Sequence, residues 1–142
     1  MSLFQPGITQ ESLNRLSANT LAEHLGIEFV AIGSDQLTAR MPVDKRTHQP
    51  YGLLHGGASV ALAETLGSVA AHCCIDITKQ YCVGLEINAN HIKSVRTGYV
   101  TGTAKPIHVG RRTQVWEIRI VNDQHELVCI SRITMAVLDK QG

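Results

Sequence analysis

The feature that most constrains this chain is a helical segment that is apolar on nearly every side. Residues 57–72 are mostly alanine, leucine, valine and glycine, and such a helix has to be covered by other parts of the protein. Glu64 is the only formal charge between Gly56 and Ile75. A carboxylate at the middle of a stretch of about 20 residues, among small side chains, argues against a membrane span. We therefore predict a buried helix within a globular domain.

The second half of the chain predicts one β-strand after another. Apolar and polar residues alternate, so that Trp116 and Ile118 point to one face of their strand while Glu117 and Arg119 point to the other. The helix is the only long apolar segment available to cover the apolar face. We therefore predict an α+β fold in which an antiparallel sheet wraps around one long central helix. The four predicted strands are residues 81–92, 98–109, 111–121 and 126–138.

The first third of the chain predicts two short helices and a hairpin. Thr20 and Glu23 have the S/T-x-x-E spacing of a capping box, and Gly26 provides a C-terminal stop, so a short helix is expected to follow Thr20. Another short helix is expected to begin at Thr9. Two apolar or alternating runs separated by Ser34 and Asp35 predict the hairpin. These runs are residues 27–33 and 36–42.

Length and charge indicate one domain without a general affinity for polyanions. A chain of 142 residues is too short for two domains with separate cores, so residues 1–142 are treated as one domain, with an N-terminal helical segment over 1–24. The net charge of +1 produces no overall field that would attract nucleic acid or an anionic membrane. The N-terminus lacks a basic segment followed by an apolar one, so no secretion signal is predicted and a cytoplasmic location is expected.

The cysteines predict free thiols. They include a vicinal pair but no CxxC motif, and their spacing fits neither a disulfide framework nor a zinc site, so no metal is expected. They are Cys73, Cys74, Cys82 and Cys129.

The start of the apolar helix carries residues suited to binding a carbonyl oxygen. His55 is followed by Gly56 and Gly57, which allow a ligand to approach the backbone closely. The free N–H groups of the first helical turn, at the positive end of the helix dipole, suit a developing oxyanion. A tight turn would also explain the two glycines, and a packed or surface role would also explain the histidine.

Glu64 is the candidate nucleophile or general base. Burial of an unpaired carboxylate costs several kcal/mol by typical desolvation estimates, and no Lys or Arg lies within four residues along the helix. Ser68 and His72 follow at i+4 and i+8, so the three polar side chains share one stripe. An arginine from a strand could still pair with Glu64, which would give it a structural role.

Glu64 and the start of the helix are too far apart to act on one carbonyl within a single chain. Nine residues separate His55 from Glu64, about 13 Å of helical rise. The two could cooperate only if the helix of a second subunit lay antiparallel alongside. This spacing predicts a symmetric homodimer with two shared sites.

Three sequence motifs together resemble one known family. The motifs are QPYGLLHGGASVALAETLGSVA, VGLEINANHIKS and HVGRRTQVWEIRI. They resemble the hotdog-fold acyl-CoA thioesterases of the phenylacetate-pathway and 4-hydroxybenzoyl-CoA thioesterase type. Within that group the chain is most similar, over roughly residues 25–138, to 1,4-dihydroxy-2-naphthoyl-CoA hydrolases and the proofreading thioesterase of enterobactin synthesis. The resemblance implies hydrolysis of a hydroxybenzoyl- or dihydroxynaphthoyl-type acyl-CoA, a link to menaquinone biosynthesis, and a homodimer that assembles further into a tetramer.

The resemblance also implies roles for the residues noted above. The Gly56 N–H would bind the thioester carbonyl, and Gln49 and His55 would place the thioester or hold the loop. Glu64 of the opposite subunit would attack the carbonyl or activate water, and Ser68 would orient the water or the substrate. No cofactor is implied, because CoA is part of the substrate.

The resemblance further implies that the CoA portion lies near Gly84 and along two polar segments of the chain. Lys93, Arg111 and Arg112 can pair with phosphates, although a solvated basic rim would look the same in sequence. The expected CoA-binding residues are Gly84, His91, Ile92, Lys93, Ser94, His108, Val109, Gly110, Arg111, Arg112 and Thr113.

Two other functions remain open at this stage. Acyl-thioester dehydratases or hydratases of the same fold also use a loop histidine and a helix carboxylate, with the histidine acting on the α-carbon of the substrate. The other alternative is a non-catalytic module that binds acyl-CoA, in which Glu64 would have no chemical role.

Overall fold

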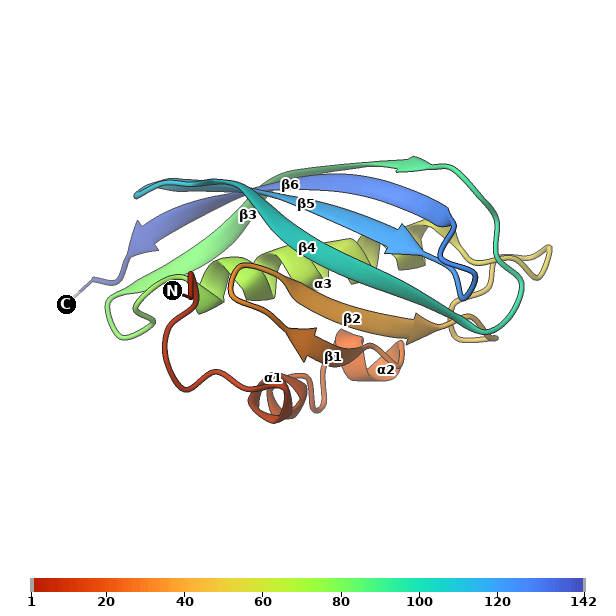
Figure 1. Cartoon of the computed structure of the whole chain (residues 1–142), viewed down its shortest axis with the longest axis horizontal. Helices are drawn as coiled ribbons and strands as arrows, with labels where there is room; N and C mark the ends of the chain where they lie inside the picture. Colours follow the sequence, from red (N-terminus) through yellow and green to blue (C-terminus); the bar gives the residue numbers. More distant parts are fainter. Residues whose placement is uncertain (1, 142) are drawn as a thin grey trace.

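Helix α3, Gly56–Cys73, lies across one face of a six-stranded antiparallel sheet in this computed structural model, which describes residues 2–141 (Figure 1). The strand order is β1-β2-β4-β5-β6-β3. The predicted α+β hotdog arrangement is therefore confirmed. Over the described range, no helix is both long and apolar enough to cross a membrane. The remaining elements are α1 (Gln10–Leu16), α2 (Leu21–His24), β1 (Glu28–Ile32), β2 (Leu37–Pro42), β3 (Gln80–His91), β4 (Tyr99–Val109), β5 (Thr113–Val121) and β6 (Leu127–Asp139).

The predicted faces of the last two strands are also confirmed. Trp116, Ile118 and Ile133 are fully buried and face α3, whereas Arg119 and Arg132 are exposed on the other side of the sheet. Because the side-chain period of a strand is two, this alternation fixes which face of β5 and β6 covers the helix.

Two glycines allow α3 to lie close to the sheet. A Cβ atom on Gly67 of α3 would overlap the Cγ2 atom of Ile133 in β6. A Cβ atom on Gly102 of β4 would lie 2.7 Å from the Cδ1 atom of Leu66 in α3. One glycine therefore makes room on the helix and the other makes room on the sheet.

The opposite side of α3 is only partly covered. Ala61, Glu64 and Ser68 are half-buried there. Strand β3 forms one edge of the sheet, and its Val83 and Leu85 are exposed. A helix whose sequence requires cover on all sides is therefore left with one uncovered side in the single chain.

The N-terminal segment contains the two predicted helices, but the predicted capping box is wrong. The Thr20 hydroxyl donates a hydrogen bond of 2.6 Å to the Ser17 carbonyl, and its side chain caps no amide of α2. The hydroxyl thus bonds within the tight turn before α2, and among residues 2–141 Glu23 makes no side-chain capping bond. The capping box instead lies at α1, where Thr9 and Ser12 each accept the backbone N–H of the other, at 3.1 and 3.0 Å.

All four cysteines are free, as predicted. Cys73, Cys82 and Cys129 are buried, and Cys74 is half-buried. Burial raises the pKa of Cys73 to about 11 and that of Cys74 to about 12, so both thiols are protonated at neutral pH.

We expect Gly67→Ala to destabilise the protein, although alanine is the better helix former. The substitution gains about 1 kcal/mol of helix propensity. The new methyl group overlaps Ile133, however, and overpacking costs about 1–3 kcal/mol. Urea unfolding measures the net loss. The double variant Gly67→Ala/Ile133→Ala should lose less free energy of unfolding than the sum of the losses in the two single variants. Strict additivity would contradict the packing explanation.

Candidate functional site

The loop between β2 and α3 is folded into a turn that presents Gln49 beside the start of the helix. The backbone N–H groups of Gln49 and His55 donate to the carbonyls of Leu53 and Thr47, both at 2.8 Å. The Gln49 side-chain oxygen accepts the N–H groups of Tyr51 and Leu53. Since that oxygen is used within the turn, the NH2 group of Gln49 is left to donate to a ligand.

The first turn of α3 leaves one backbone amide available. The Nδ1 atom of His55 accepts the N–H of Gly57 at 2.8 Å, which makes His55 the N-cap of the helix. The His55 carbonyl accepts the N–H of Ala58 at 3.0 Å. Among the described residues, no acceptor is found for the N–H of Gly56. This amide lies at the positive end of the helix dipole and can bind an oxyanion.

A cavity of about 340 Å³, here called the Gly56 cavity, opens next to this amide. The Nε2 atom of His91, at the end of β3, lies 3.0 Å from the place that a Gly56 Cβ atom would occupy. A larger residue at position 56 would therefore press against His91. The cavity brings together six of the predicted site residues, namely Gln49, Gly56, His91, Ile92, Lys93 and Ser94. Its other lining residues, which the sequence did not indicate, are Leu53, Leu54, Ser59 and Val128.

Glu64 lies in the middle of α3 and faces Gly84 of β3. Its Oε2 atom is 3.0 Å from the position that a Gly84 Cβ atom would occupy. Within residues 2–141, the Glu64 carboxylate has no hydrogen-bond donor, and no Lys or Arg lies within 4.0 Å of it. The side chain is half-buried. Among the described residues, no arginine of a strand pairs with Glu64, so the structural role considered above is not supported.

An apolar cavity of about 600 Å³, here called the α1 cavity, begins one helical turn beyond Glu64. It lies between α1, the C-terminal half of α3 and the start of β3. Of the predicted site residues, only Ser68 lines it. Local patterns could not indicate the rest, because the lining comes from four separate parts of the chain. The lining residues are Ile8, Ser12, Leu13, Leu16, Ser68, Val69, His72, Cys73, Ile77, Gln80, Tyr81 and Lys140.

The second group of predicted CoA residues lies at the other end of the sheet. Residues 108–113 include the end of β4, the turn after it and the first residue of β5, whereas the start of α3 and the end of β3 lie where β5 ends and β6 begins (Figure 1). A strand of nine residues separates the two ends by about 30 Å. A single chain therefore does not bring residues 108–113 together with Gly56.

The basic residues predicted to hold phosphates are partly engaged with carboxylates. Lys93 lies 3.0 Å from Glu126, and Arg112 lies 3.7 Å from Asp139. All four side chains are about half or more exposed. Of these basic residues, Arg111 alone has no carboxylate within 4.0 Å in the described range.

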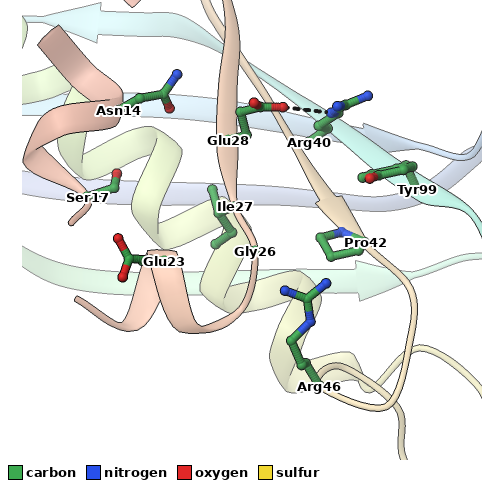
Figure 2. Close-up of a pocket in the computed structure, with 10 residues that line it drawn as sticks. All are labelled: Asn14, Ser17, Glu23, Gly26, Ile27, Glu28, Arg40, Pro42, Arg46 and Tyr99. Carbon is green, nitrogen blue, oxygen red and sulfur yellow. Dashed lines mark hydrogen bonds and ion pairs between the residues drawn. The ribbon is translucent and has the colours of Figure 1, made fainter. Parts of the chain in front are cut away.

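A third hollow, of about 450 Å³, lies between the two short helices and β2 and contains none of the predicted site residues (Figure 2). Arg40 pairs with Glu28 at 3.0 Å and lies 4.4 Å above the Tyr99 ring. Arg46 is bound to Asp44, and its side-chain hydrogen bonds lower the pKa of Asp44 to about 2. Two acidic residues, Glu23 and Glu28, line the hollow beside these two arginines, so it has no net positive charge that would attract an anion.

Comparisons with known proteins match most of this chain. The family model of the thioesterase superfamily matches residues 51–129. A 1,4-dihydroxy-2-naphthoyl-CoA hydrolase of Escherichia coli is 53% identical over 131 residues, which are 92% of this chain and 96% of that protein. The proofreading thioesterase EntH of Cronobacter turicensis is 53% identical over 131 residues, 92% of this chain and 95% of its own. The crystal structure of a mutant thioesterase (Q49A) from Pseudomonas aeruginosa has a TM-score of 0.96 and 52% identity, and covers 98% of this chain and 100% of that chain.

We expect His55→Ala to lower the free energy of unfolding by about 1 kcal/mol, because the Gly57 N–H loses its side-chain acceptor. His55→Asn keeps an acceptor at the N-cap and should retain most of the stability. Urea unfolding of the two variants measures the difference. Equal losses for alanine and asparagine would show that the cap contributes nothing.

Proposed function

The chain belongs to the thioesterase superfamily, and we propose that it hydrolyses an aromatic acyl-CoA to the free acid and CoA. The Glu64 carboxylate carries the proposal. It is half-buried on an apolar helix, has no basic partner in the described chain, and lies one turn from an apolar cavity. A carboxylate in these surroundings is suited to attack a carbonyl carbon or to take a proton from water.

The thioester carbonyl would be bound by the N–H of Gly56. Eight residues, about 12 Å of helical rise, separate Gly56 from Glu64 within one chain. The two residues also face different parts of β3, since Gly56 lies by His91 and Glu64 lies by Gly84. A complete site therefore needs Glu64 of the partner subunit, on an α3 helix that runs antiparallel to this one.

The uncovered side of α3 supports this dimer. For Gly56 to face the partner's Glu64, the two-fold axis has to pass between the two α3 helices. It lies level with the midpoint of positions 56 and 64, beside Val60 and Ala61. Both residues are half-buried in the single chain. The edge strand β3, whose Gly84 faces Glu64, lies along the same side and would be covered as well. Assembly of two dimers into a tetramer, and a cytoplasmic location, remain part of the proposal.

Two chemical routes fit the proposed geometry. In the first, a Glu64 oxygen bonds to the carbonyl carbon, the C–S bond breaks, and water then hydrolyses the mixed anhydride. In the second, Glu64 takes a proton from water, the water oxygen bonds to the carbonyl carbon, and the proton passes to the leaving CoA sulfur. In both routes Gly56 stabilises the negative charge on the carbonyl oxygen. Ser68 would orient the water or the substrate, and Gln49 and His55 would hold the loop.

The α1 cavity would receive the acyl group. Glu64, Ser68 and His72 lie on one stripe, which leads from the proposed point of attack into the cavity. Its apolar lining and its volume of about 600 Å³ suit a ring system such as benzoyl or naphthoyl. The relatives named above include a hydrolase of 1,4-dihydroxy-2-naphthoyl-CoA, which supports a bicyclic aromatic acid and a role in menaquinone biosynthesis.

CoA would extend from the Gly56 cavity along Lys93 and Ser94. The pairing of Lys93 with Glu126 does not oppose this, because an exposed ion pair contributes only about 0–1 kcal/mol and its partners can be exchanged. Residues 108–113 would contribute from another subunit, since their own sheet holds them at the far end. Arg111 and Arg112 would then bind phosphates of the nucleotide.

We expect Glu64→Gln to reduce turnover of an aromatic acyl-CoA at least about 100-fold while fold and dimer are retained. The amide has the same shape but cannot act as a nucleophile or a base. Release of free thiol from benzoyl-CoA measures the rate, and circular dichroism with gel filtration checks the fold. Glu86→Gln, which removes an exposed carboxylate near Gly84, is the matched control and should keep wild-type turnover. Near-wild-type activity of Glu64→Gln would exclude the proposed role.

We expect two inactive variants to restore activity when their chains are mixed. Glu64→Gln keeps the Gly56 amide, and Gly56→Val fills the space beside His91 but keeps Glu64. After co-refolding of equal amounts, half of the dimers are mixed and each holds one intact site, so about a quarter of wild-type activity should return. Mass spectrometry of the mixture verifies that mixed dimers have formed. Their presence without activity would mean that each site is built within a single chain.

A further inference from the structure

A second, smaller cavity lies directly beyond the α1 cavity. It has a volume of about 210 Å³ and is lined by Gln5, Pro6, Ile8, His72, Ile75, Asp76 and Ile77. Three of these residues, Ile8, His72 and Ile77, also line the α1 cavity. We call these three residues the wall, because they lie between the two spaces.

His72 is the fixed member of the wall. Its Nδ1 atom lies 2.8 Å from the Ser68 carbonyl, and its Nε2 atom lies 3.4 Å from the backbone N–H of Cys82. Because Nε2 accepts the hydrogen bond of the Cys82 N–H, the ring N–H is on Nδ1, which donates to the Ser68 carbonyl. The imidazole is thereby attached to α3 on one side and to β3 on the other.

The two isoleucines come from segments that flank this histidine. Ile8 lies just before α1, and the residues that precede it are fixed to the end of α3 by a 2.8 Å hydrogen bond from the Gln5 N–H to the Cys73 carbonyl. Ile77 lies in the turn after α3, and it is 60% exposed. Neither isoleucine belongs to the fully buried core, so both can be shortened without loss of the fold.

The space beyond the wall is more polar than the α1 cavity. Asp76 lines it, and its Oδ1 atom accepts the hydroxyl and the N–H of Thr78 at 2.6 and 3.0 Å. These hydrogen bonds hold the pKa of Asp76 below its usual value, so the carboxylate is charged at neutral pH. An apolar group that passed the wall would have to displace the water around this charge.

We propose that Ile8, His72 and Ile77 set the maximum length of the acyl group by closing the far end of the α1 cavity. This inference rests on the proposed function, in which the carbonyl is bound near Glu64. Glu64 and His72 are eight residues apart, about 12 Å of helical rise, so an acyl group that extends along the stripe meets His72 two turns on. The wall thus admits compact ring systems and rejects extended ones of similar width.

The test compares two aromatic substrates of different length in wild type and in the double variant Ile8→Ala/Ile77→Ala. The substrates are 2-naphthoyl-CoA and the longer 4-biphenylcarbonyl-CoA. Opening the wall should raise the ratio of kcat/KM for the biphenyl substrate over the naphthoyl substrate at least about tenfold, the usual scale for steric selection in an apolar pocket. Ile107→Ala, which shortens a half-exposed isoleucine outside both cavities, is the matched control and should leave the ratio unchanged. An unchanged ratio in the double variant overturns the proposal.

A binding measurement separates this proposal from the proposed function. Isothermal titration of the free acids, 2-naphthoate and biphenyl-4-carboxylate, requires no turnover. The double variant should bind the biphenyl acid at least about tenfold more tightly than wild type does, with little change for naphthoate. If no acyl-CoA is hydrolysed but the double variant binds the biphenyl acid more tightly, the proposed function is wrong and the proposal about the wall is supported. Two results overturn the proposal about the wall even if thioesters are hydrolysed. One is an equal affinity of wild type and double variant for the biphenyl acid, and the other is that neither acid binds to either protein.

Discussion

The close contact between α3 and the sheet is the interaction on which the other features of this chain depend. Gly67 and Gly102 remove the two methyl groups that would hold helix and sheet apart, and Leu66 fills the space between them. Close packing of this kind leaves the helix little freedom to rotate about its axis. Because Leu66 faces the sheet, Glu64 and Ser68 are left on the uncovered side. The packing that stabilises the fold therefore also determines the direction of the carboxylate.

The same orientation explains why so apolar a helix keeps one half-buried side in the single chain. Its own sheet covers only one face, and the edge strand β3, whose Gly84 faces Glu64, lies beside the uncovered side. Under the proposed function, a second copy covers this surface and supplies the carboxylate that each site lacks. Burial of apolar surface and completion of the site then become one event, so a chain that fails to associate loses both.

What the sequence could predict depended on local periodicity. The position of α3 follows from its continuous apolar sequence and is confirmed to within one residue at each end, with 57–72 predicted and Gly56–Cys73 observed. The faces of β5 and β6 follow from a spacing of two residues and are also confirmed. The capping of α2 could not be predicted, because the Thr20 hydroxyl donates to the Ser17 carbonyl in the preceding turn instead of accepting an amide N–H of the helix, and the spacing of Thr20 and Glu23 does not show this. The Gln49 and Gly56 side of the site was predicted from its motif, whereas Val128 entered it only through the pairing of distant strands.

The α1 cavity was also beyond prediction, for a related reason. Its roof exists because the Asn14 side chain bonds the backbone N–H and carbonyl of Phe29, at 2.8 and 3.0 Å, and so ties α1 to β1. An asparagine in a short helix gives no sign of a partner 15 residues away. Contacts of this type depend on the three-dimensional path of the chain rather than on any repeat within it.

The N-terminal segment has a consequence for how such a protein diversifies. Phe4 stacks on Trp116 with ring centroids 6.2 Å apart, and this anchor brings Ile8 and α1 over the end of the central helix. Under the inference drawn above, one of the three wall residues, Ile8, is encoded far from the reactive stripe, whereas His72 lies on the stripe and Ile77 directly follows the helix. Drift at the codon for Ile8 can therefore shift a duplicated copy toward longer acids while Glu64 and Ser68 stay unchanged.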